Sequence, residues 1–274
     1  MSTEVLRYTA FSTDPAGGNP AGVVLDASEL ADPDLLRIAA EVGYSETAFL
    51  TRTADRDYRV RYFSPLAEVD FCGHATIATS VALAERIGAG SLVLHTNTGD
   101  VRVETAHGRA TLTSVAPHSR PATSTEVADT LRALRWAATD LDPAFPARVA
   151  YAGNDHLMLG VASRARLATL DYDFDALGSI MRTAGWTTVH LFHEDARRHF
   201  QARDPFPVGG VVEDPATGAA AAAFGGYLRD IGYADTGTIT IEQGVDLGRP
   251  SRLEVDLDSG APGIRVTGAA VRIG

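Results

Sequence analysis

Two long runs without a charged residue constrain this chain more than any other feature of its sequence. The first run covers residues 75–84 and the second covers residues 216–228. Both consist mainly of small and apolar residues, so they predict helices without a polar face, which a protein must bury on all sides. Each run follows a short polar cluster, at residues 70–74 in the first case and 213–214 in the second.

The polar clusters stand where the two buried helices would begin. The first backbone N–H groups of a helix have no partner within it, so a helix N-terminus binds anions readily. We therefore expect one pocket for a small acidic molecule, built from both halves of the chain. Its backbone donors would come from Gly73 in the first half and from Thr217, Gly218 and Ala219 in the second. Asp214 fits either an N-cap or a group that holds a substrate amine or hydroxyl.

Composition excludes several function classes. The formal net charge of −11 argues against nucleic acid and anionic membranes as partners. All 24 basic residues are Arg, so the Lys of a pyridoxal-phosphate Schiff base or of a Walker phosphate loop is missing. Cys72 is the only cysteine, which excludes an internal disulfide and a multi-thiolate metal site.

Residues 1–10 lack the charged segment and apolar core of a signal peptide, and the apolar runs are too short to cross a membrane. The sequence therefore predicts a cytoplasmic protein.

Short β-like runs joined by turn residues fill both halves of the chain. They predict an α/β (α+β) protein of two similar lobes, each a barrel-like, mostly antiparallel sheet wrapped around a central helix. We place one lobe at residues 1–118 around helix 74–88 and the other at 119–274 around helix 216–231. A weak internal repeat, which aligns Val69 with Val212, supports two similar lobes. The cleft between them would be the preferred ligand site.

Two local patterns add to this plan. Asp32 precedes Pro33 and predicts an N-cap with proline at the first helical position. Residues 117–124 are rich in Pro, Ser and Thr and predict a linker between the lobes.

Glu46 is the strongest candidate for acid/base chemistry. It is a lone acid at the entrance to the apolar residues 47–50, which would desolvate its carboxylate as proton transfer requires. The alternative is a solvent-facing residue at the start of a strand. His74 would stand at a helix N-terminus, where the cationic form is disfavoured, so we expect a neutral imidazole. Cys72 is either a reactive thiol at the same N-terminus or a buried structural residue.

One histidine-rich segment has the composition of a metal site but not the pattern. The cluster comprises His190, His193, Glu194 and His199, and its H-x-x-H-E spacing matches neither the H-E-x-x-H nor the H-x-x-E-H zinc motif. A strand at this place would also send His190 and His193 to opposite faces. We therefore expect no metal site.

Several segments together resemble the phenazine-biosynthesis isomerase family (the PhzF-like proteins), which has the diaminopimelate-epimerase-like fold. They occur in the family's order and span nearly the whole chain. The matching segments are residues 18–23 (GNPAGV), 45–49 (SETAF), 61–65 (RYFSP), 68–76 (EVDFCGHAT) and 213–218 (EDPATG).

The resemblance implies a homodimer of two-lobed chains whose last strand crosses back to the first lobe. It also implies isomerisation of trans-2,3-dihydro-3-hydroxyanthranilate without metal or cofactor. The family's acid/base glutamate falls on Glu46, and the His and Asp that contact the substrate fall on His74 and Asp214. Ala219 stands where the family often has Ser.

The leading hypothesis is thus a cofactor-independent isomerase of a small amino or hydroxy carboxylic acid, in which Glu46 transfers the proton. Asn19, Ser45 and Cys72 would add to the substrate contacts. One alternative is an amino-acid epimerase or racemase, with Glu46 and either Cys72 or Asp214 as bases on opposite faces. Another is a non-catalytic protein that binds a small acid.

Overall fold

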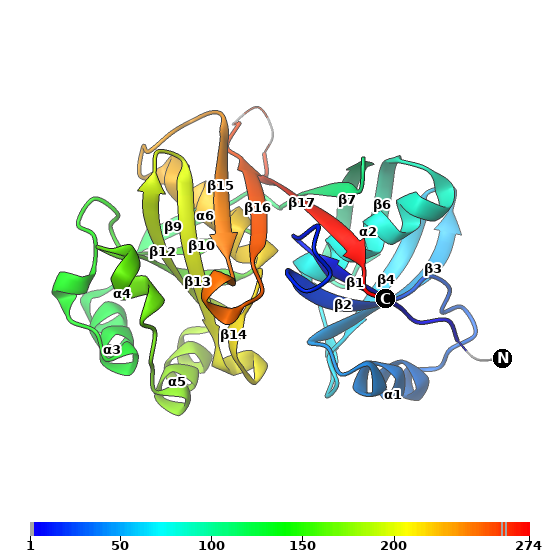
Figure 1. The fold of residues 1–274 in the computed structure, drawn as a ribbon, viewed down its shortest axis with the longest axis horizontal. Coiled ribbons are helices and arrows are strands. Elements are labelled where there is room, and N and C mark those ends of the chain that lie inside the picture. The colour runs from blue at the N-terminus through cyan, green and yellow to red at the C-terminus, as the bar shows by residue number, and fades with distance from the viewer. Residues whose placement is uncertain (1–2, 259, 261) are drawn as a thin grey trace. The chain divides into compact units, whose positions relative to one another are not determined.

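The computed structural model describes residues 3–258, 260 and 262–274, and it divides into two compact units. One unit comprises residues 1–113 and 267–274, and the other comprises residues 114–266. Each is described by itself (Figure 1). Residues 1 and 2, part of the stretch searched for a signal peptide, lie outside the described residues. Within the described part, no helix is both long and apolar enough to cross a membrane.

Eight strands of the first unit close into a ring. Neighbours pair antiparallel except where β2 meets β3 and where β4 meets β6, which are parallel. The last strand, β17, closes the ring by pairing with both β1 and β8. The strands are β1 (Leu6–Ala10), β2 (Asn19–Val24), β3 (Glu46–Ala54), β4 (Asp57–Phe63), β6 (Gly90–Thr96), β7 (Gly99–Ala106), β8 (Arg109–Thr113) and β17 (Arg265–Arg272); β5 (Glu68–Val69) extends β4.

The ring surrounds helix α2 (Gly73–Ile87), of which every residue from Gly73 to Leu83 is buried. The prediction of a helix buried on all sides is confirmed here, because this part of the helix has no face toward water. Helix α1 (Asp32–Val42) packs outside the ring against Val24, Phe49 and Phe63. Its N-cap is Ala31, so the prediction of Asp32 as N-cap is wrong by one residue.

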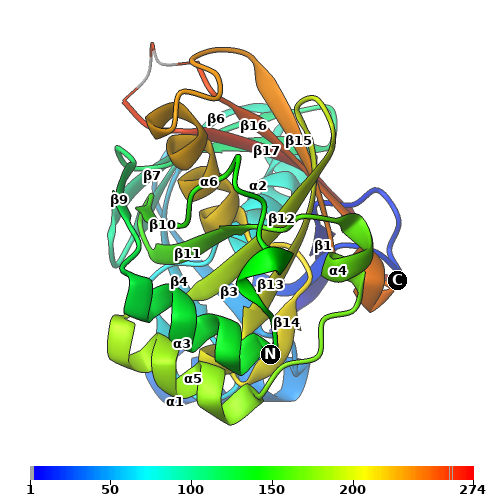
Figure 2. The same ribbon diagram turned by 90° about the vertical axis from the view of Figure 1, so that its left-hand side faces the viewer.

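The second unit repeats this plan. A seven-strand sheet runs from β9 to β16, with parallel pairs at β11–β12 and β13–β15. An eighth strand, β14, pairs only with the end of β13. Helices α3 and α5 lie side by side on its outside (Figure 2) and share a buried cluster with the sheet residues Leu157, Val189 and Leu191. The strands are β9 (His118–Pro121), β10 (Arg148–Tyr151), β11 (Asp155–Gly160), β12 (Thr188–Ala196), β13 (His199–Phe206), β14 (Val211–Asp214), β15 (Thr238–Gln243) and β16 (Ser251–Asp256); the outer helices are α3 (Ser124–Leu134), α4 (Arg164–Ala168) and α5 (Phe174–Ala184).

Helix α6 (Gly218–Asp230) is the central helix of this unit, and its residues from Ala220 to Leu228 are buried. Two glycines let it pack closely. A Cβ on Gly225 would lie 2.8 Å from Val255, and one on Gly226 would lie 2.4 Å from Pro117. The predicted fold class, mostly antiparallel barrel-like sheets around a central helix, is confirmed.

The strand pairing sets the internal repeat in a different register from the one expected. In the first unit, Val69 of β5 lies opposite Tyr62 of β4. In the second unit, Asp214 of β14 lies opposite Asp204 of β13. Both Val69 and Asp214 stand four residues before the first residue of a central helix. Val69 therefore corresponds to Asp214, and its alignment with Val212 is wrong by two residues. Residues 117–124, predicted as a linker, contain strand β9.

Candidate functional site

Five predicted site residues meet at one edge of the first unit. Strands β2 and β3 run parallel, with Ala21 opposite Glu46, so both strands begin at the same edge. Asn19 is the first residue of β2 and Glu46 the first of β3. The N-terminus of α2 reaches the same place with Cys72 as its N-cap. Parallel pairing thus brings together residues that lie far apart in the sequence.

His74 lies at the centre of this group. Its Nε2 is 3.3 Å from Oε2 of Glu46 and 3.4 Å from Oγ of Ser45. On its other side, Nδ1 is 3.1 Å from Nδ2 of Asn19 and 3.4 Å from Sγ of Cys72. The side chains of His74 and Glu46 are 6% and 14% exposed, so the contact between them is largely shielded from water.

Burial decides the charge of His74. It lowers the pKa of the imidazole below its ordinary value, and the nearby Glu46 carboxylate offsets this only in part. The positive end of the α2 dipole disfavours the imidazolium in the same direction. A neutral imidazole at neutral pH can donate a proton to a hydrogen bond from one nitrogen and accept one at the other.

The backbone around this group is held firmly. Thr76 donates from both its backbone N–H and its Oγ1 to the Cys72 carbonyl, and Tyr62 OH lies 2.6 Å from the same Oγ1. Gly18 has a φ of +65°, and a Cβ there would lie 2.3 Å from the Ala10 carbonyl oxygen. Only glycine fits this turn, which delivers Asn19 to the edge.

In the second unit, Asp214 and Thr217 lie together at the start of α6. Thr217 is the N-cap, and its Oγ1 donates to Oδ2 of Asp214 over 2.6 Å. Gln243 braces both residues: its Oε1 accepts from the Thr217 N–H, and its Nε2 donates to the Asp214 carbonyl over 2.8 Å. Gly218 and Ala219 follow as the first residues of the helix.

Sequence reasoning missed Gln243, which is 1% exposed. The available signal was a polar residue at the end of a predicted strand, directly before a glycine. That Gly244 has a φ of +74°, and a Cβ there would lie 2.7 Å from the Pro215 carbonyl oxygen.

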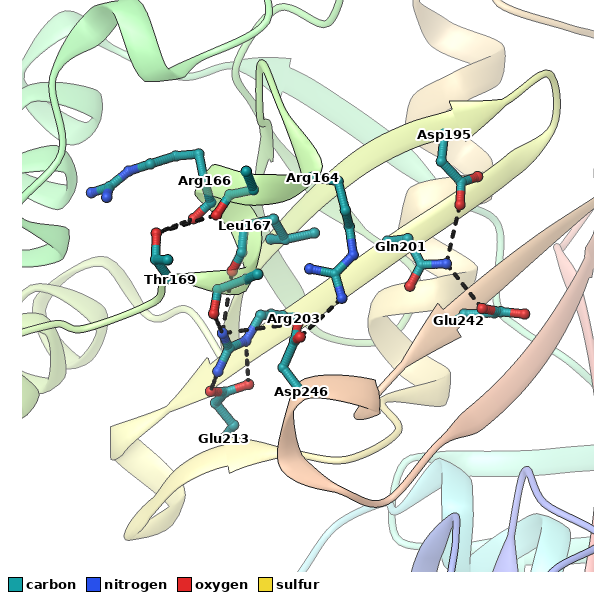
Figure 3. A network of polar contacts seen from close by, with 12 residues as sticks. Arg164, Arg166, Leu167, Thr169, Asp195, Gln201, Arg203, Glu213, Glu242 and Asp246 are labelled. Atoms are coloured by element: carbon teal, nitrogen blue, oxygen red, sulfur yellow. Dashed lines mark hydrogen bonds and ion pairs between the residues drawn. The ribbon is translucent and has the colours of Figure 1, made fainter.

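Sequence reasoning also missed an arginine that fixes the residue before Asp214 (Figure 3). Arg203 on β13 forms a two-pronged ion pair with Glu213, with Nε 2.9 Å from Oε2 and Nη2 on Oε1. Its Nη1 donates to the carbonyls of Leu167 and Ala168. The Arg203 and Glu213 side chains are 9% and 3% exposed. This buried pair anchors β14 and the segment that carries Asp214.

The structure assigns the histidine-rich segment to internal contacts. His190 Nδ1 lies 2.7 Å from Oδ1 of Asp204 in the core, whereas His193 Nδ1 lies 2.9 Å from the Val161 carbonyl oxygen.

The distances given for Glu46 lie within the first unit and those for Asp214 lie within the second. A single pocket shared by Glu46 and Asp214 therefore stays a prediction.

The chain is similar to known proteins over nearly its whole length. A family model described as phenazine biosynthesis-like protein matches residues 8–274. An uncharacterized isomerase of Bacillus subtilis is 31% identical and covers 98% of this chain and 96% of its own length. The trans-2,3-dihydro-3-hydroxyanthranilate isomerase of Pseudomonas aeruginosa is 35% identical, over 89% of this chain and 86% of its own.

Among solved structures, one from Pseudomonas aeruginosa described as a predicted epimerase superimposes with a TM-score of 0.87 at 26% identity. The match covers all of this chain and 98% of the other.

Proposed function

Because the chain belongs to the phenazine biosynthesis-like protein family and is an isomerase, we propose that it shifts a proton, and with it a double bond, within a small amino or hydroxy carboxylic acid. The observation that carries this proposal is the shielded Glu46–His74 contact at the buried N-terminus of the central helix α2. Trans-2,3-dihydro-3-hydroxyanthranilate, which the Pseudomonas aeruginosa relative's name specifies, is the first substrate to test.

In the proposed reaction, the Glu46 carboxylate takes a proton from a carbon next to, or conjugated with, the substrate carboxylate. The electron pair of the broken C–H bond moves into the conjugated system. The glutamic acid then returns the proton to a different carbon, so the double bond shifts and no electrons are gained or lost. No cofactor is needed for such a transfer, and the chain has no Lys for pyridoxal phosphate.

The remaining residues would bind and orient the substrate. Negative charge that develops during proton removal is stabilised by backbone N–H groups at a helix N-terminus, which Gly73 offers in α2 and Gly218 in α6. Neutral His74, oriented by Asn19, would hydrogen-bond the substrate beside Glu46. Asp214, braced by Gln243, would hold the amine or hydroxyl. At Ala219, where the family often has a serine, only the backbone N–H remains as a donor to the substrate. The homodimer that the resemblance implies stays a prediction.

Glu46→Gln tests the proposal directly. The variant keeps the size of the side chain but cannot take up the proton, so we expect turnover to fall by at least about 10²-fold while folding is retained. Proton NMR in D₂O follows both product formation and entry of deuterium into the ring. Glu41→Gln is the matched control, since Glu41 is an exposed acid of the same unit. Unchanged turnover in Glu46→Gln would refute the assignment of the base.

An epimerase is the second candidate, because Cys72 places a thiol beside His74 and a structural neighbour is described as an epimerase. That reaction needs a second base on the opposite face of the carbon. Inversion of a stereocentre that stops in Cys72→Ala, with no double-bond shift, would favour it.

A further inference from the structure

The donor atoms of Glu46, Cys72 and His74 form a compact group. One carboxylate oxygen, the thiol sulfur and one imidazole nitrogen all lie within 4.8 Å of one another. Cys72 and His74 are buried and Glu46 is partly buried. Thiolate, imidazole and carboxylate are the three ligand types that proteins use for zinc.

Two of the three distances within the group match a tetrahedral metal site. A tetrahedral zinc ion with bonds of about 2.0–2.3 Å places its ligand atoms about 3.3–3.8 Å apart. In the structure, His74 Nε2 lies 3.3 Å from Oε2 of Glu46 and 3.7 Å from Sγ of Cys72. These two distances between ligand atoms already lie within the tetrahedral range.

Charge and hydrogen bonding favour an ion at this position. Oε2 of Glu46 is buried and accepts no hydrogen bond from the described residues. A divalent cation would give this oxygen a partner. Together with one thiolate and one carboxylate it would make a site without net charge, which lowers the cost of burying the ionised groups.

We infer that Glu46, Cys72 and His74 bind a thiophilic divalent metal ion, with Zn²⁺ as the best match to the donor set, and that the ion inhibits the enzyme. Binding releases the proton of the Cys72 thiol to solvent and leaves a fourth coordination position open. The ion occupies the lone pair with which Glu46 would take the substrate proton. The inhibition rests on the proposed function, whereas the binding does not.

Asn19 controls the strength of this site. With Nε2 on the metal, His74 carries its proton on Nδ1 and needs an acceptor there. The Asn19 side chain, now with Nδ2 at 3.1 Å, must then turn so that Oδ1 accepts. A carboxylate at this position would be a better partner, as it is for many zinc-binding histidines. Asn19→Asp should therefore bind the metal more tightly.

Titration of the purified full chain with Co²⁺ tests the binding without any substrate. We expect the visible bands of a tetrahedral site and a near-ultraviolet thiolate-to-cobalt band, both abolished by one equivalent of Zn²⁺. Cys72→Ser should lose the thiolate band and weaken Co²⁺ binding by at least about tenfold, and Asn19→Asp should strengthen it about tenfold. His199→Gln, which removes a partly buried histidine of the second unit beside Asp195 and Glu242, should change neither.

Thermal unfolding of each variant separates loss of the site from loss of the fold. A Co²⁺ spectrum without the thiolate band, or equal affinity in folded Cys72→Ser, would overturn the proposed site. If Co²⁺ binds as expected but Glu46→Gln retains full turnover, the metal site stands and the proposed base is wrong.

Discussion

The two units carry the same ion pair at the same place and bury it to different depths. Arg61 and Glu68 flank the Tyr62–Val69 strand pair, and Arg203 and Glu213 flank the corresponding Asp204–Asp214 pair. The first pair is 27% and 29% exposed, whereas the second is 9% and 3% exposed.

The neighbours of the two arginines differ in the same way. Arg61 adds a contact to Asp32, which is 73% exposed. Arg203 binds two backbone carbonyls, and its second carboxylate neighbour, Asp246 at 4.0 Å, is only 24% exposed. One arrangement of residues thus serves as a solvent-screened surface contact in one unit and as an internal anchor in the other.

The largest effect should come from breaking the buried pair. Arg203→Met leaves the Glu213 carboxylate buried without its partner, so we expect the free energy of unfolding to fall by about 3–5 kcal/mol. Arg61→Met leaves Glu68 close to water and should cost about 1 kcal/mol or less. Urea unfolding measures both: tryptophan fluorescence reports on the second unit through Trp136 and Trp186, and circular dichroism follows both units.

A double-mutant cycle sharpens the same comparison. Arg203→Met combined with Glu213→Leu removes both charges and should recover most of the stability that the single change loses. The corresponding cycle of Arg61 and Glu68 should give a coupling below about 1 kcal/mol. Equal coupling in the two units would show that burial does not distinguish the pairs.

A titration difference between the units should be the next largest effect. In the second unit, fully buried His156 of β11 lies opposite Thr188 of β12. At the corresponding place in the first unit, Ala21 of β2 lies opposite Glu46 of β3. Burial lowers the pKa of His156 from 6.5 to about 4. Between these values the unfolded chain binds the proton and the folded chain does not, so stability falls as the pH falls, by about 3 kcal/mol in total.

His156→Asn keeps a polar group near Thr188 but removes the titration. We expect its free energy of unfolding to depend less steeply on pH between about pH 6.5 and pH 4 than that of the wild type. The wild type and the variant are compared by urea unfolding at several pH values. Parallel pH profiles would assign the acid sensitivity to other groups.

The smallest effects concern how each central helix is held at its start. Gln243→Leu leaves the Thr217 N–H and the Asp214 carbonyl buried without their side-chain partner, which should cost about 2 kcal/mol or more. Tyr62→Phe removes the tyrosine hydroxyl that contacts Thr76 Oγ1, but Thr76 still donates to the Cys72 carbonyl. We therefore expect the free energy of unfolding to fall by only about 0.5–1 kcal/mol. A larger loss in Tyr62→Phe than in Gln243→Leu, measured by the same urea unfolding, would contradict this order.

Local features of the chain were sufficient to predict the two central helices and the residues at their N-termini. An uncharged run such as residues 216–228 predicts a buried helix, because a helix formed from it has no polar face to turn toward water. Glu46 and His74 were assigned to one site by the family resemblance, whereas local features marked each of them only separately. The repeat of the two lobes was visible, although its register was not.

Only the tertiary structure decided which distant residues complete each site. Gln243 lies 26 residues from Thr217, and Arg203 lies 10 residues from Glu213 across a strand pair. Their polar groups carry no local signal, because a buried partner is chosen by strand register. The return of the last strand was implied by the family resemblance, but its partners in the ring, β1 and β8, came only from the structure. Periodicity and charge act on neighbours along the chain, whereas register and burial arise only when the whole chain has folded.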